Sequence, residues 1–101
     1  MRTLIRLEIP AEKGNAAIKD GSLQKTLEWA MQELQPEAAY FTPVGGNRGG
    51  YLVVDLKQES DMPKIAERFF MLGATVEFSP AMTMQDVQAG LEKAYGAART
   101  A

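Results

Sequence analysis

The chain of 101 residues contains no cysteine and no histidine. Without cysteine the protein forms no disulfide bonds, thiolate nucleophiles or zinc–thiolate sites, and the sequence fits a reducing compartment. Without histidine, the usual general base near neutral pH and the commonest metal ligand are missing as well. Any chemistry must therefore use carboxylates, Tyr, Lys, Arg or a borrowed cofactor. We expect neither a resident cofactor nor a metal ion.

The sequence also lacks long apolar runs and a dominant sign of charge. No hydrophobic segment approaches the roughly 18 residues that span a membrane, and no signal peptide is read in residues 1–6. The 11 basic and 13 acidic residues alternate along the chain and give a net charge of −2, so there is no basic stripe for nucleic acid. We expect a cytoplasmic protein that binds neither membranes nor nucleic acid.

Length and composition predict one globular domain over residues 1–101, because 46% of the residues are hydrophobic and 24% are charged. A domain of this size buries only about 60 to 70% of the surface of its unfolded chain. Association would add burial, so we expect the chain to pair with itself as a homodimer or to form a higher oligomer.

Hydrophobic periodicity predicts four strands and three long helices. The expected strands are residues 2–9, 37–44, 51–56 and 75–79, and the expected helices are residues 22–35, 61–72 and 84–98. The segment 10–21 reads as a connection with one helical turn at 16–19, and the glycine-rich segment 45–50 reads as the loop of a hairpin. Thr83 is a predicted N-cap of the last helix, with Asp86 at the third helical position.

This order of elements is typical of an α+β, ferredoxin-like βαββαβ domain with a terminal helix. Right-handed crossovers then give a four-stranded antiparallel sheet of order 4-1-3-2, with the first two long helices on one face. The side chains expected to meet those helices are Ile5, Leu7, Ile9, Leu52, Val54, Leu56, Val76 and Phe78.

Three segments carry a resemblance to a known family. They are residues 14–23 (GNAAIKDGSL), 36–41 (PEAAYF) and 48–55 (RGGYLVVD), and the likeness continues into 76–82 (VEFSPAM). The chain resembles a family of roughly 100-residue bacterial proteins without an assigned activity, in the dimeric α/β-barrel superfamily. The resemblance implies a dimer in which two ferredoxin-like sheets face each other. It implies no particular reaction, because the superfamily contains monooxygenases, isomerases and ligand-binding regulators.

The sheet face turned away from the helices carries the candidate binding residues: Arg6, Glu8, Tyr40, Thr42, Tyr51, Asp55 and Glu77. The order 4-1-3-2 places Arg6 between the strands that carry Asp55 and Glu77. One interpretation is a salt-bridge cluster beneath a dimer interface, because a buried charge must be paired. The other is a pocket in which Arg6 anchors a small anionic or aromatic ligand, with Glu77 or Asp55 as a base.

Three functions are compatible with these patterns. The first is a small-molecule binding or regulatory module, which needs only a cavity and a few polar anchors. The second is a cofactor-independent isomerase or monooxygenase-like enzyme, which needs a carboxylate or Tyr base beside an apolar cleft. The third is a structural or partner-binding dimer. No motif in the sequence decides whether the protein is an enzyme.

Overall fold

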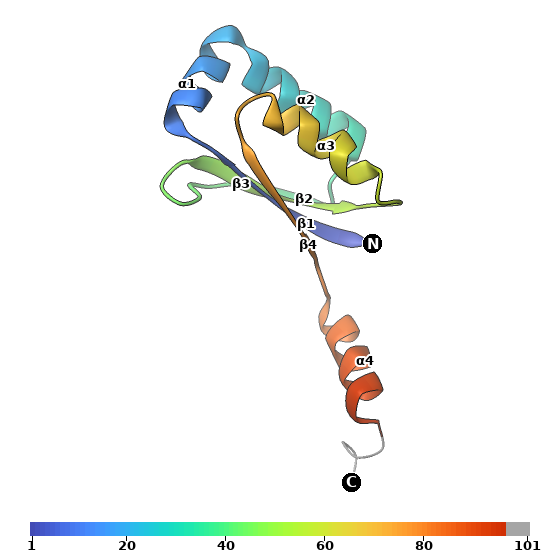
Figure 1. Ribbon diagram of the computed structural model, residues 1–101. Coiled ribbons are helices and arrows are strands. Elements are labelled where there is room, and N and C mark those ends of the chain that lie inside the picture. The colour runs from blue at the N-terminus through green and yellow to red at the C-terminus, as the bar shows by residue number, and fades with distance from the viewer. Residues whose placement is uncertain (97–101) are drawn as a thin grey trace.

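A computed structural model describes residues 1–96 and shows an α+β domain with a helix projecting from it (Figure 1). The elements are β1 (Arg2–Ile9), α1 (Ala11–Asp20), α2 (Ser22–Leu34), β2 (Ala38–Phe41), β3 (Arg48–Asp55), α3 (Asp61–Phe70), β4 (Thr75–Pro80) and α4 (Met84–Tyr95).

The four strands form one antiparallel sheet in the order β2-β3-β1-β4, which reads β4-β1-β3-β2 from the other edge. Helices α1, α2 and α3 cover one face of this sheet, and the other face is open (Figure 1). The domain therefore has two layers, and its core lies between them. The predicted α+β fold with a four-stranded antiparallel sheet is confirmed.

Alternation along the strands decides which side chains enter the core. On β1, buried residues alternate with partly exposed ones, and the buried set includes Ile5, which is fully inaccessible. Leu52 on β3 and Ile65 on α3 are the other large side chains with almost no exposure. These residues pack in one cluster, so the inward set expected from the sequence is the set that meets the helices.

The connection expected at residues 10–21 is wrong, because a complete helix, α1, occupies Ala11–Asp20. The residues that α1 buries are Gly14 and Ala17, so its inward face lacks the large apolar side chains by which the other helices were identified. Gly21, with a φ of 82°, turns the chain in the left-handed conformation between α1 and α2.

The hairpin loop is also tighter than expected. Its turn is formed by Gly45 and Gly46, both with positive φ, and is closed by two backbone hydrogen bonds between Val44 and Asn47. This pattern is typical of a type I′ turn. The following glycine, Gly49, belongs to β3 instead of the loop.

Helix α4 does not pack on the rest of the domain. The predicted capping box is confirmed: the Thr83 hydroxyl accepts from the Asp86 amide at 3.2 Å, and the Asp86 carboxylate accepts from the Thr83 amide at 2.9 Å. None of the residues of α4 is buried. The radius of gyration is 17.0 Å, against about 13 Å for a compact domain of this length. The expected end of this helix at Ala98 lies outside the described residues.

No helix within residues 1–96 has the combination of length and apolar character that a membrane span requires.

Candidate functional site

The open face of the sheet carries most of the candidate residues expected from the sequence. Arg6 and Glu8 lie on β1, Tyr51 and Asp55 on β3, and Glu77 on β4, each alternating with residues turned to the helices. Tyr40 on β2 is paired with Tyr51 and is 72% exposed. The structure therefore places six of the seven expected residues on this sheet face.

Arg6 forms a salt-bridge cluster with Glu77, as expected, and with Glu8 in place of the expected Asp55. Its Nη1 lies 3.2 Å from Glu77 Oε1, and its Nη2 lies 3.5 Å from Glu8 Oε1. The expected contact with Asp55 is wrong, because the register opposes Arg6 to Tyr51 and Arg2 to Asp55. Four residues along a strand separate the two positions by about 13 Å.

Asp55 lies at the far end of β3, where it forms ion pairs with two other cations. Its carboxylate accepts a hydrogen bond from Lys57 Nζ, and its Oδ1 lies 2.9 Å from the α-amino group of Met1. These two cations, Lys57 first, lower the pKa of Asp55 to about 2. Asp55 is therefore an exposed, fully ionised carboxylate and is a poor general base near neutral pH.

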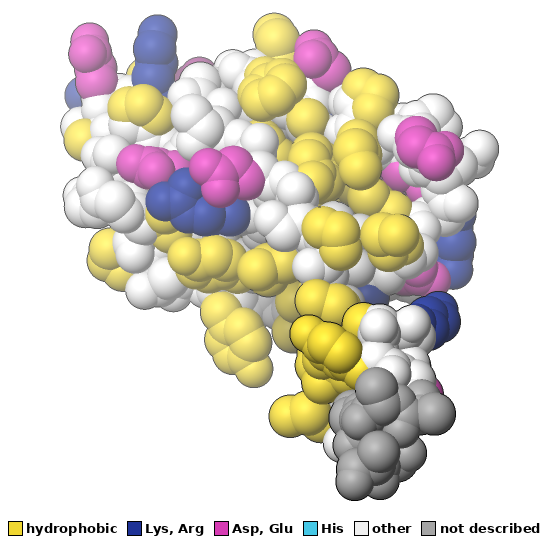
Figure 2. Space-filling model, turned by 60° about the horizontal axis from the view of Figure 1, so that its bottom comes forward, with side chains coloured by type: hydrophobic (Ala, Val, Ile, Leu, Met, Phe, Trp, Pro, Cys, Tyr) yellow, Lys and Arg dark blue, Asp and Glu magenta, His cyan; other side chains and the backbone are white. Residues whose placement is uncertain are grey.

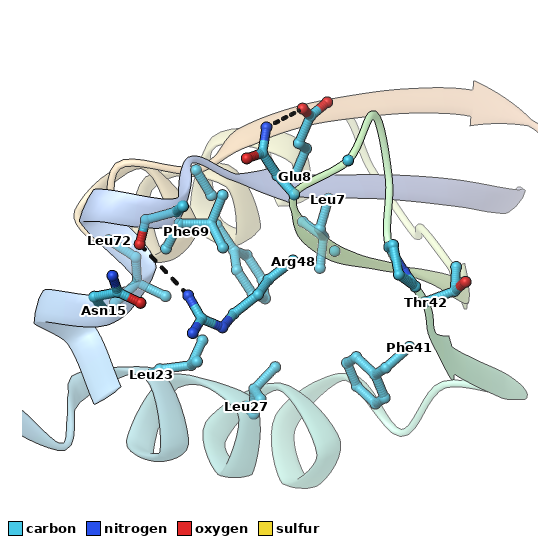
Figure 3. Close-up of a pocket in the computed structure, with 17 residues that line it drawn as sticks. Leu7, Glu8, Asn15, Leu23, Leu27, Phe41, Thr42, Arg48, Phe69 and Leu72 are labelled. Atoms are coloured by element: carbon cyan, nitrogen blue, oxygen red, sulfur yellow. Dashed lines mark hydrogen bonds between the residues drawn. The ribbon is translucent and has the colours of Figure 1, made fainter. Parts of the chain in front are cut away.

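Thr42 belongs to a different site and lies just beyond β2, which ends at Phe41, with its amide donating a hydrogen bond to the Gly49 carbonyl at 3.1 Å. There it lines a cavity of about 700 Å³ between the sheet and helices α1 and α2, at the hairpin end of the sheet (Figure 3). We call this cavity the hairpin-end cavity. Its lining is mostly apolar: Leu7, Ile9, Leu23, Leu27, Phe41, Phe69 and Leu72.

Arg48, the first residue of β3, extends into the hairpin-end cavity (Figure 3). Its Nη1 donates a hydrogen bond to the backbone carbonyl of Ala11 at 3.4 Å. Within residues 1–96 no carboxylate lies within ion-pairing distance of this guanidinium. Arg48 is exposed to solvent and brings a positive charge, without an acidic partner within residues 1–96, to the edge of a mostly apolar cavity.

Glu8 lies at the rim of the same cavity but is turned away from Arg48 (Figure 3). Its Oε2 accepts a hydrogen bond from Asn47 Nδ2 at 2.9 Å, and its other oxygen faces Arg6. Glu8 therefore links the cluster on the open face to the rim of the hairpin-end cavity. Asn15 on α1 is a further polar residue of the lining.

The sequence analysis did not identify Arg48, Asn15 or Asn47 as site residues. Asn15 and Arg48 are 33 positions apart in the sequence. The two come together only because α1 packs over the start of β3. Gly14 was not a signal for this approach, because residues 10–21 were expected to form a connection, where glycine is common.

Comparison with protein-family models gives no match, and none of the curated proteins matches the sequence. Within residues 1–96 no group of three or more carboxylates is arranged to hold a metal ion.

Proposed function

We propose that the protein is a small-molecule binding module and that the hairpin-end cavity holds its ligand. The observation that carries this proposal is the cavity itself, whose volume of about 700 Å³ lies within the range of roughly 300 to 1,000 Å³ typical of ligand pockets. Its lining follows the usual pattern of such pockets, with apolar walls and a few polar groups that fix orientation.

An isomerase or monooxygenase-like activity has weaker support. Of the two expected bases, Asp55 is held ionised by Lys57 and the α-amino group, and Glu77 is 63% exposed and paired with Arg6. Neither carboxylate is desolvated in the way that a general base of raised pKa requires. We therefore propose a binding function in preference to a catalytic one. A cytoplasmic location is a separate prediction.

Titration with a neutral apolar probe tests the binding proposal. We expect 4-phenylbutan-1-ol to shift the backbone amide NMR signals of Leu23, Leu27 and Phe41, because these residues line the cavity. A Leu27→Trp variant fills the cavity and should abolish the shifts. Lys25→Trp is the control, because Lys25 is exposed on the same helix and does not line the cavity. Shifts confined to the open sheet face, or none at millimolar probe, would contradict the proposal.

We further propose that two copies pair as a dimeric α/β barrel, with the open sheet faces toward each other and α4 in the interface. Four side chains of α4 form one stripe at helical spacing: Met84, Val87, Leu91 and Tyr95. Hydrophobic side chains also lie over the open sheet face, beside a cluster of charged ones (Figure 2). An apolar stripe on a helix that does not pack on its own domain is typical of an interaction surface. This stripe therefore also favours a structural or partner-binding role.

The molar mass in solution tests this pairing. We expect light scattering at micromolar concentration to give twice the chain mass of 11.1 kDa. Leu91→Asp should reduce the mass to that of a monomer, because it puts a charge into the centre of the stripe. Ala89→Asp adds the same charge on the opposite side of α4 and should leave the dimer intact. A monomeric parent would contradict the dimer, and a dimeric Leu91→Asp variant would remove α4 from the interface.

A further inference from the structure

We infer that the ligand of the hairpin-end cavity is a small organic monoanion, a carboxylate on an apolar body, and that Arg48 binds its carboxylate. This inference rests on the proposed function and adds the chemical class of the ligand. Two features of the cavity have to be explained together. Its walls suit an apolar body, and its one cation lacks an acidic partner within residues 1–96.

The hydrogen bonds of Arg48 leave most of its donors for a ligand. A guanidinium carries five N–H donors in a planar fork, and within residues 1–96 its one protein acceptor is the carbonyl oxygen of Ala11, at a long 3.4 Å. A carboxylate accepts two parallel hydrogen bonds from such a fork. Asn15 lies beside Arg48 on the α1 side of the cavity and offers an amide donor to the same group (Figure 3).

The guanidinium of Arg48 lies against α1 at Gly14. A Cβ atom at Gly14 would lie 2.8 Å from Arg48 Nη1, which is closer than real Cβ contacts. Gly14 has ordinary helical geometry, since its φ is not positive, and glycine inside a helix is unfavourable. Gly14 therefore leaves the space that the end of the Arg48 side chain occupies, and a side chain at this position would displace it.

Glu8 limits the charge of the ligand. Its carboxylate lies at the rim of the cavity, where Asn47 and Arg6 hold it on the side away from Arg48. A second anionic group on the ligand would meet this negative charge without a second free cation in the lining. A dicarboxylate or a phosphate dianion is therefore disfavoured, and a monocarboxylate fits.

The test compares two probes of nearly the same shape, 4-phenylbutyrate and the neutral 4-phenylbutan-1-ol. Isothermal titration of the full-length protein should give tighter binding of the acid, by about 2- to 5-fold, because an ion pair with an exposed guanidinium contributes modestly to affinity. Arg48→Met should remove this preference and leave the binding of the alcohol unchanged. Arg2→Met is the control, because it removes the same charge from an exposed ion pair with Glu37.

A second variant, Gly14→Ala, tests the same inference and leaves the residue Arg48 unchanged. Its Cβ atom displaces Arg48, so the preference for the acid should fall here too, while circular dichroism checks that α1 is intact. Equal binding of acid and alcohol by the parent, or a preference that survives Arg48→Met, would overturn the inference but leave the binding function standing. Failure of both probes to bind would overturn the proposed function as well.

Discussion

The contact between Gly14 and Arg48 makes a prediction that unfolding experiments can test. Replacing the helical Gly14 by Ala should stabilise α1 by about 0.5–1 kcal/mol, because glycine inside a helix is unfavourable by that amount. The new methyl group would, however, lie 2.8 Å from Arg48 Nη1 and force the guanidinium off its position against Ala11. The effect of the substitution should therefore depend on the residue at position 48.

The magnitudes of the opposing contributions are similar. Displacing Arg48 loses a long hydrogen bond, at the lower end of about 0.5–1.5 kcal/mol, while the exposed side chain can take another staggered rotamer at little cost. In the parent protein, Gly14→Ala should thus be close to neutral. In an Arg48→Ala background the obstacle is absent, and the same substitution should raise the free energy of unfolding by about 0.5–1 kcal/mol.

Urea unfolding of the four proteins, followed by circular dichroism, measures this coupling. All four must be compared at one protein concentration, because dissociation of a dimer would contribute to the unfolding free energy. We expect a coupling of about 0.5–1 kcal/mol between the two positions, within the range found for residues in contact. If Gly14→Ala changes stability equally in both backgrounds, to within about 0.3 kcal/mol, the guanidinium does not rest against α1 and the reasoning fails.

Three further predictions concern the sheet. Gly49→Ala should lower the free energy of unfolding by about 1–3 kcal/mol, because its Cβ would meet the Leu7 carbonyl of the central strand, and an unchanged urea midpoint would contradict this close approach. Asp55→Asn should destabilise the protein near neutral pH. Because Lys57 lowers the pKa of Asp55 from 3.8 to about 2, the ionised carboxylate stabilises the folded protein. This contribution is complete above about pH 4 and is lost as the pH falls through 2. The difference in urea midpoint between parent and variant should therefore shrink toward pH 2, and a constant difference would exclude this cause. Arg6→Met should raise the dissociation constant of the proposed dimer in sedimentation experiments, because two glutamates would be left in the interface without their counter-ion. An unaltered dissociation constant would place this cluster outside the interface.

Local patterns in the sequence were sufficient to predict several elements. The alternation of β1 needs only its own residues, because successive side chains of a strand point to opposite faces, and Ile5, Leu7 and Ile9 are buried as expected. The cap of α4 is equally local, since Thr83 and Asp86 satisfy each other's backbone amides within one turn. These features depend on residues close together in the chain, and their chemistry is independent of the rest of the fold.

Register and small residues limited the prediction. The partner of Arg6 on β3 depends on where the hairpin turns, and four nearby glycines left that point open until the turn was placed at Gly45 and Gly46. A shift of a few residues exchanges Tyr51 for Asp55 beside Arg6. Helix α1 was missed because it buries only Gly14 and Ala17, and Gly14 lies next to Asn15 in a segment with the composition of a loop.

The sequence by itself therefore determined which strand residues enter the core, the succession of the four strands along the chain and the absence of histidine and cysteine chemistry. Only the tertiary structure decided that α4 leaves the domain and that Arg48 lies against α1 in an apolar cavity. The physical reason is that a cavity is a property of packing between elements: residues from β1, α1, α2, the hairpin and α3 surround it, and no local pattern in any one segment specifies that they meet.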